Sequence, residues 1–304
     1  MNHHVLPPLG LALVTGLVFP WLLVRARWAQ QAPRLALAVW IACAAVFALA
    51  AAMLPAQLLL PARTSHRLVD LALTLRLPSP RRLAAGSARE FLAAGAALAV
   101  AAVPATGFVR ELLRARRART RHAELLRLVG RPDPHLGVTV LEDARPAVYC
   151  LPGRSRRVVV SSGAVEMLTA PQLAAALAHE RAHIGGRHHL LVAAAGAYSG
   201  RVFRRLPLAR IGGRAVPLLL EMAADDRALR GCSRDALAHA LYALAAGRAP
   251  HRAFAAGGPS AALRMSRILA PPAPGRPVLR GLLAVAAVVS VVAPLVFACC
   301  SVPG

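Results

Sequence analysis

The chain has 304 residues, of which 57% are apolar and only 16% are charged, and its mean hydropathy is +0.52. These values exclude an intrinsically disordered chain and a small disulfide-stabilised scaffold, and they predict an integral membrane protein. The net charge of +24 comes from arginine alone, and the arginines are scattered without a recognition module, so the charge does not predict nucleic-acid binding.

Four uncharged segments are long enough to cross a bilayer, which needs about 20 helical residues. They are residues 5–24, 35–60, 91–109 and 281–300. The first has no basic leading region and contains Pro8 and Pro20, so we expect a retained span rather than a cleaved signal peptide. A shorter apolar run at 189–200 predicts a buried or interfacial helix.

Four spans divide the chain into a membrane domain (1–109), a large loop (110–277) and a fourth span with a short tail (278–304). Twelve arginines flank the spans on the side of the large loop and six on the other side, in the 61–90 loop. The positive-inside rule therefore predicts a multi-pass cell-membrane protein whose large loop is cytoplasmic. A basic helix expected at 111–128 is either an ordinary solvated helix or a contact for anionic lipid headgroups.

The large loop has the pattern of a folded, mostly helical domain with a small sheet. Short β-branched runs predict strands, at 138–141, 147–151 and 157–161. Thr169 and Gln172 form a capping-box pattern, which predicts a helix that ends near Gly185. Two further helices are expected, over 216–230 and from Ser233 to Ala246.

Residues 179–183 read His-Glu-Arg-Ala-His, the HExxH pattern. On a helix this spacing places the imidazoles of His179 and His183 on one face, where they can bind one tetrahedral zinc ion. Glu180 lies one residue round the helix, off the metal, and can act as general base toward a zinc-activated water. A random chain of this composition contains the pattern about 0.01 times. The alternative, three residues that merely decorate a helix, would bury unpaired polar groups.

A catalytic zinc ion needs a third protein ligand, and Glu221 on the following apolar helix is the best acid for it. Asp225 lies one turn later and is expected to support a ligand imidazole through its second ring nitrogen. The alternative is that both acids pair with Arg227 or Arg230 on the helix surface.

His188 and His189 follow the zinc helix and are candidates for contact with the substrate or the transition state. The alternative is that both are structural or solvated. One zinc ion per chain is expected, because His179, His183 and Glu221 form one cluster.

The sequence HERAH with a downstream EMAAD, behind three spans and before a fourth, resembles membrane-bound zinc peptidases of the BlaR/MecR antirepressor type. These are gluzincins related to the HtpX-like and CAAX prenyl protease peptidases. The stretches AVYCLPG and VVVSSGAVEML are also similar to the strands before their zinc site. The resemblance implies a gluzincin-like fold with His179, His183 and Glu221 as zinc ligands, Glu180 as the catalytic glutamate and Asp225 as the aspartate behind a ligand. The chain departs from that type after the fourth span, where we expect no penicillin-binding sensor domain.

These features predict an integral-membrane zinc metalloendopeptidase that hydrolyses peptide bonds, with regulatory proteolysis of a cytoplasmic or membrane-proximal protein as its expected role. Expected partners are a protein or peptide substrate, the lipid bilayer and a separate sensor or repressor protein. An extended substrate is expected to dock beside residues 158–160. The alternative is a non-catalytic membrane transducer or scaffold with a structural zinc site. Glu180 favours the enzyme, because structural zinc sites fill all four positions with ligands and need no base.

Overall fold

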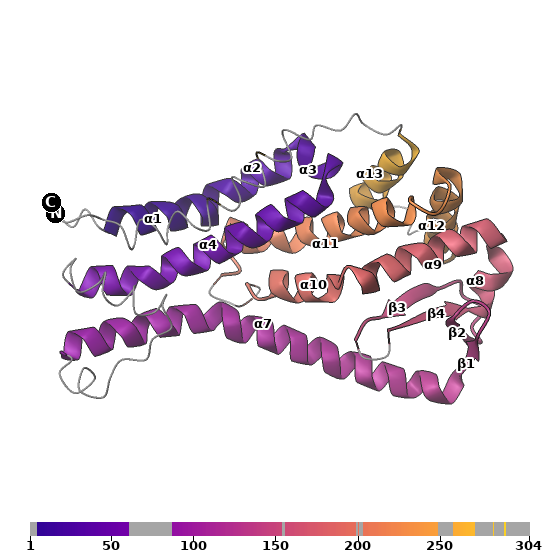
Figure 1. Ribbon diagram of the computed structural model, residues 1–304, viewed down its shortest axis with the longest axis horizontal. Helices are drawn as coiled ribbons and strands as arrows, with labels where there is room; N and C mark the ends of the chain where they lie inside the picture. The colour runs from indigo at the N-terminus through magenta and orange to yellow at the C-terminus, as the bar shows by residue number, and fades with distance from the viewer. Residues whose placement is uncertain are drawn as a thin grey trace. The chain divides into compact units, whose positions relative to one another are not determined.

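The computed structural model describes residues 5–60, 87–153, 156–198, 200, 203–248, 258–270, 282 and 289. These residues are mostly helical, with one small mixed sheet (Figure 1). The chain divides into two compact units. The first contains residues 1–109, 194–215 and 276–304, and the second contains 110–193 and 216–275. The segment 194–215, which lies inside the large loop of the sequence, thus belongs to the first unit.

The first unit begins with a helical hairpin. Its first arm consists of α1 (Leu6–Leu13), a π-helical turn (Val14–Val18) and α2 (Phe19–Arg25). The short α3 (Arg27–Gln31) then leads into α4 (Pro33–Leu59). The two arms approach closely because Gly16 has no side chain: a Cβ there would lie 2.8 Å from the ring of Phe47. Cys43 also donates from its Sγ to the backbone oxygen of Thr15 at 3.3 Å.

Three helices in the described part of the chain are long and apolar enough to cross a membrane: Leu6–Arg25, Pro33–Leu59 and Ala88–Val129. The first two agree with the predicted spans 5–24 and 35–60 within two residues, and the third contains the predicted span 91–109. The predicted fourth span, 281–300, lies outside the described residues except for Leu282 and Val289.

The helix α7 (Ala88–Val129) is 42 residues long and has residues in both units. It joins two predicted elements, the third span and the basic helix at 111–128, without a break. The residues change from apolar to basic at Arg110, yet the helix runs unbroken through Pro104, Gly107 and this change in composition.

The second unit contains a sheet of four described strands: β1 (Gly130–Asp133), β2 (Val138–Leu141), β3 (Val148–Leu151) and β4 (Arg157–Ser161). Their order is β1-β2-β4-β3; β2 and β4 are parallel and the outer pairs are antiparallel. The sequence did not predict β1, because Gly130 and Pro132 disfavour strands, yet proline is tolerated on an edge strand. The expected docking of a substrate beside 158–160 is wrong, because β4 is paired on both sides and the edge strands are β1 and β3.

Helices cover both faces of this sheet (Figure 1). The helices that follow the sheet in the chain are α8 (Ser162–Met167), α9 (Ala170–Gly185), α10 (His188–Gly196), α11 (Pro207–Ala228), α12 (Arg234–Arg248) and α13 (Gly258–Leu269). On one face α9 and α12 pack against inward side chains such as Val158 and Val160, and on the other Leu126 of α7 contacts Leu151 and Val159. The sheet therefore gives α9 a rigid support.

The predicted ends of α9 are confirmed. The backbone N–H of Thr169 donates to Oε1 of Gln172 at 3.0 Å, which completes the capping box, and the helix ends at Gly185. The predicted cap of α12 is also present, because Ser233 Oγ accepts a hydrogen bond from the Ala236 N–H at 3.2 Å. The helix predicted at 216–230 is longer than expected and begins at Pro207.

Candidate active site

The helices α9 and α11 bring three side chains together that the sequence analysis selected: His179, His183 and Glu221. The Nε2 atoms of the two histidines are 3.2 Å apart. Each carboxylate oxygen of Glu221 lies 3.4 Å from one of these nitrogens, Oε2 from His179 and Oε1 from His183. His179 is buried, while the other two side chains are half-buried. The cluster therefore lies at the boundary between the core and solvent.

The spacing of these atoms fits a tetrahedral metal ion. Zinc binds imidazole nitrogen and carboxylate oxygen at about 2.0–2.2 Å, so neighbouring ligand atoms in a tetrahedron lie about 3.3–3.5 Å apart. The observed separations are 3.2, 3.4 and 3.4 Å. Two imidazoles and one carboxylate are also a ligand set that zinc prefers at catalytic sites, where a fourth position stays open. The donor set and its geometry thus both suit zinc.

Asp225 stands behind the cluster and is fully buried. Its Oδ1 lies 3.0 Å from Nδ1 of His179. Arg264 of α13 donates to the same carboxylate from Nε and Nη2, each at 2.9 Å, and its Nη1 lies 2.9 Å from Oε2 of Glu221. One guanidinium therefore fixes the carboxylates of both Asp225 and Glu221.

Arg264 was not among the site residues predicted from the sequence. The only signal in the sequence was an amphipathic stretch with two arginines one helical turn apart, Arg264 and Arg267. They are candidate partners for the adjacent acids Asp225 and Asp226 on α11. The Nη2 atom of Arg267 lies 2.7 Å from Oδ1 of Asp226. Arg267 is one of the twelve arginines that flank the predicted spans on the side of the large loop.

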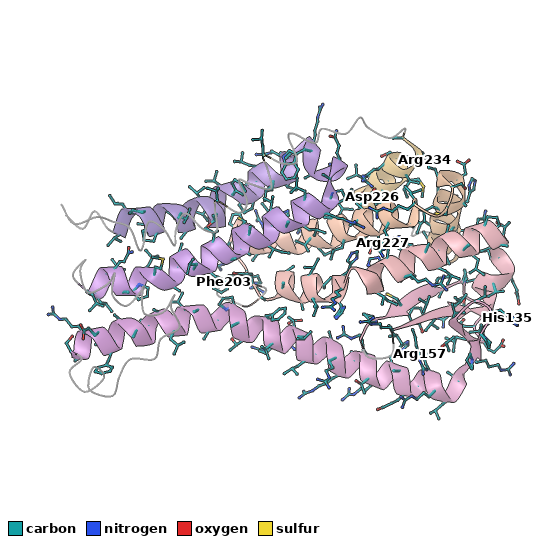
Figure 2. The ribbon with its side chains drawn as sticks, viewed as in Figure 1. His135, Arg157, Phe203, Asp226, Arg227 and Arg234 are labelled. Carbon is teal, nitrogen blue, oxygen red and sulfur yellow. The ribbon has the colours of Figure 1, made fainter. Side chains whose placement is uncertain are left out.

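The end of α13 is held by the start of α12. The Nη1 atom of Arg234 donates to the backbone oxygens of Ile268 and Ala270, at 2.6 and 2.8 Å. Figure 2 labels Arg234 and Asp226, which lie on the neighbouring helices α12 and α11. These carbonyl contacts fix the helix that carries Arg264.

The two other histidines that the sequence analysis selected have different surroundings. Nδ1 of His188 lies 2.9 Å from Nδ1 of His183, so His188 contacts the far side of that ring from Glu221. His189 lines a separate small cavity. Among the described residues it makes no contact with the cluster. Only His188 is thus placed to orient a cluster residue.

Glu180 points toward the edge strand. Its carboxylate interacts with the thiol of Cys150 on β3, and burial, the largest influence, raises the pKa of Glu180 although the charge of His179 opposes it. Burial, followed by the nearby charge of Glu180, raises the pKa of Cys150 to about 12. The thiol is therefore neutral at physiological pH, as expected for a buried cysteine rather than a nucleophile.

The two clustered histidines have opposite pKa shifts. Burial acts to lower the pKa of His179, but Asp225 and Glu221 outweigh it and raise the pKa to about 9. Burial lowers the pKa of His183 to about 4, assisted by the charge of His179 and opposed by Glu221. Two imidazoles this close hold one proton between them, on the ring beside Asp225.

Burial acts to raise the pKa of Glu221 and Asp225, but His179 and Arg264 outweigh it, so both pKa values lie below the usual range. Both carboxylates are therefore ionised at neutral pH. The site offers negative charge and a neutral imidazole to a cation.

Comparison with known proteins supports this assignment in part. Residues 112–205 match the family profile of Peptidase family M48, and the match includes His179, Glu180 and His183 but ends before Glu221. No curated protein and no solved structure matches the chain. The match covers less than half of the chain and supports a metallopeptidase of a membrane-type zinc family.

Proposed function

We propose that this protein is an integral-membrane zinc metalloendopeptidase that cleaves a cytoplasmic or membrane-proximal protein. The observation that carries the proposal is the set of three ligand atoms from His179, His183 and Glu221, separated by 3.2–3.4 Å, with Glu180 beside them on α9. The match to Peptidase family M48 and the three apolar helices support it.

In this proposal His179, His183 and Glu221 hold one zinc ion. When bound, zinc supplies a Lewis acid that polarises a water molecule and the carbonyl of the scissile peptide bond. Glu180 accepts the proton of the attacking water and later delivers it to the leaving amine. Its raised pKa suits both steps, because a general base works best when its pKa lies closer to the operating pH.

Three residues around the ligands position them in this mechanism. Asp225 and His188 hold the second ring nitrogens of His179 and His183, which fixes the orientation of each imidazole. Arg264 offsets one of the two negative charges of Asp225 and Glu221 and holds Glu221 in place. Together they keep the ligand atoms at metal-binding separation.

The edge strand β3 is the expected docking site of an extended substrate. Its outer edge is unpaired among the described strands, and Cys150 on it contacts Glu180. A peptide that pairs with the β3 backbone would therefore pass the general base. Recognition through the backbone provides affinity without a strict sequence requirement.

A zinc-dependent peptidase assay tests the proposal. The full-length protein, purified in detergent, should contain about one zinc ion per chain and cleave members of a degenerate peptide library. Glu180→Gln should keep zinc but lose cleavage by about a hundredfold or more, because the amide cannot accept the proton. His183→Ala should lose both zinc and cleavage.

The matched control is Glu166→Gln, which makes the same chemical change at an exposed position on α8. It should cleave the library like the unmodified protein. Full turnover in Glu180→Gln would refute the mechanism. A stably bound metal with no cleavage of any peptide or protein would instead favour the non-catalytic alternative.

A further inference from the structure

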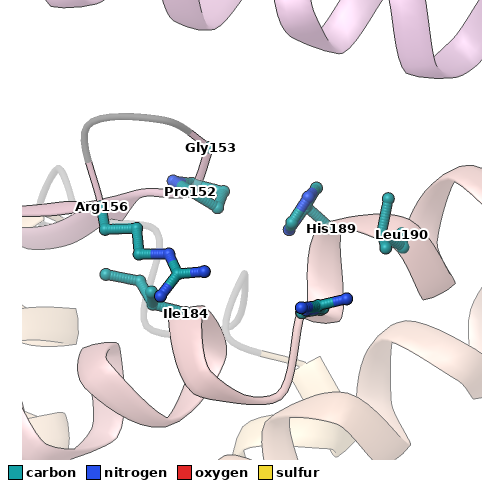
Figure 3. Close-up of a pocket in the computed structure, with 7 residues that line it drawn as sticks. Pro152, Gly153, Arg156, Ile184, His189 and Leu190 are labelled. Carbon is teal, nitrogen blue, oxygen red and sulfur yellow. The ribbon is translucent and has the colours of Figure 1, made fainter.

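A small cavity lies beside the candidate active site, and two arginines are among the residues that line it. Its volume is about 220 Å³, less than the 300 Å³ or more that is usual for sites of small molecules. The lining consists of the Pro152–Gly153 turn and the side chains of Arg156, Ile184, Arg187, His189 and Leu190. Figure 3 shows Arg156 on one side of the cavity and His189 with Leu190 on the other.

The cations of this cavity lack anionic partners in the described part of the chain. Neither Arg156 nor Arg187 forms an ion pair there, and no acidic residue lines the cavity. The Nδ1 atom of His189 is buried and has no hydrogen-bond partner among the described residues. Burial and then the charges of Arg119 and Arg187 lower the pKa of His189, so its ring is a neutral hydrogen-bonding group in a positive field.

Two of the lining arginines have unusual backbones. The φ angles of Arg156 and Arg187 are +38° and +50°, in the left-handed region that non-glycine residues seldom adopt. The cost is on the order of 1 kcal/mol for each. The chain thus holds both arginines at the cavity in a conformation that glycine or asparagine would adopt more easily.

The position of the cavity connects it with the peptide-docking strand. The Pro152–Gly153 turn directly follows β3, and Ile184 directly follows His183 on α9. A peptide paired with β3 would therefore carry side chains past the cavity within a few residues of the scissile bond. The cavity suits one side chain rather than a whole cofactor.

We propose that this cavity is a specificity site that binds an aspartate or glutamate side chain of the substrate. The inference rests on the proposed peptidase function and names a class of substrate for it: proteins with an acidic residue close to the cleaved bond. The two guanidinium groups would bind the carboxylate through charge-assisted hydrogen bonds, with His189 as an additional partner. Ile184 and Leu190 would pack against the methylene groups of the bound side chain.

Paired peptides test the inference. The probe is a set of fluorescein-labelled degenerate dodecapeptides with either Glu or Gln fixed at one position, scanned along the peptide. Binding to zinc-loaded Glu180→Gln protein is measured by fluorescence anisotropy, and cleavage by the unmodified enzyme is measured in parallel. At one position the Glu peptides should bind and be cleaved about tenfold better than the Gln peptides.

The variants remove the positive charges of the cavity. Arg156→Asn combined with Arg187→Asn should bring the Glu-to-Gln ratio to within twofold of one, and asparagine tolerates the left-handed backbone. Arg157→Gln removes the same charge from an exposed neighbour that does not line the cavity, and should leave the ratio unchanged. Equal zinc content in all variants confirms that they are folded.

Three other outcomes would overturn the acidic site. Cleavage without any Glu preference in the unmodified enzyme, or a preference that survives the double substitution, overturns the acidic site while the peptidase stands. Absence of both binding and cleavage overturns both proposals. If the double substitution instead weakens only the binding to vesicles that contain phosphatidylserine, the anion is a lipid headgroup and the substrate site is refuted.

Discussion

Arg264 binds the buried carboxylate of Asp225 through two parallel hydrogen bonds, from Nε to Oδ2 and from Nη2 to Oδ1, each 2.9 Å long. The same guanidinium contacts Glu221 at 2.9 Å. A residue 39 positions further along the chain thus determines the charge balance behind the ligand cluster. The fixed planar fork of arginine suits such a contact, and lysine could not reproduce it.

Arg264→Met should destabilise the protein by about 3–5 kcal/mol, because it removes both guanidinium hydrogen bonds from the fully buried Asp225 and leaves it only its contact with His179. The matched control is Arg267→Met on the same helix. Its partner Asp226 is 34% exposed, so the loss there should be at most about 1 kcal/mol. Thermal unfolding of both detergent-solubilised variants measures the difference. Equal shifts would show that Arg264 contributes no more than a surface ion pair.

His188→Phe should lower zinc affinity about 10- to 100-fold, because Nδ1 of His183 loses its partner at 2.9 Å. His188→Gln, which keeps a polar atom, should recover part of the loss. Competition with a chelating dye measures the affinities, and His239→Phe, at an exposed histidine of α12, is the control. Unchanged zinc affinity with lost turnover would instead place His188 in contact with the substrate.

Zinc affinity should increase about tenfold per pH unit between about pH 6 and pH 9 and then level off. The reason is that the pKa of His179 is raised to about 9 in the metal-free protein, so zinc must displace one proton below that pH. His183, with its pKa lowered to about 4, contributes nothing in this range. Calorimetry in buffers of different ionisation enthalpy should show about one proton released at pH 7. Release of none would contradict the shift.

The same shift has a consequence for stability. Because the pKa of His179 is raised in the folded state, its protonation stabilises the metal-free protein. This contribution is fully present below the unfolded pKa of about 6.5 and disappears as pH rises through about 9.

Asp225→Asn removes a main cause of the raised pKa of His179. Its zinc affinity should therefore level off at a lower pH than that of the unmodified protein.

The large loop should face the cytoplasm, because the basic flanks of the spans favour that side. A cysteine introduced at the exposed His135, with Cys232, Cys299 and Cys300 replaced by serine, should resist an impermeant maleimide in intact cells and react after lysis. The background protein without the new cysteine is the control. Labelling in intact cells would reverse the topology and direct the substrate search to extracytoplasmic proteins.

The sequence by itself determined the elements whose signals are local. Apolar length gave the first three spans, the β-branched run gave β4 at its observed bounds, and the Thr169–Gln172 capping box gave the start of α9. The HExxH spacing selected two cluster histidines, because a helix places residues four apart on one face. Glu221 could also be selected, as an acid on an apolar helix.

The tertiary structure decided what depends on segments far apart in the chain. The amphipathic stretch around Arg264 does not identify its partners, since its role exists only where α13 meets α11. The edge position of β3 and the central position of β4 follow from a strand order that periodicity cannot specify. The strand β1 contradicts its own propensity, because pairing with β2 supplies hydrogen bonds that outweigh the cost of Gly130 and Pro132. Local patterns thus fix which residues can do chemistry, and packing decides which partners hold them in position.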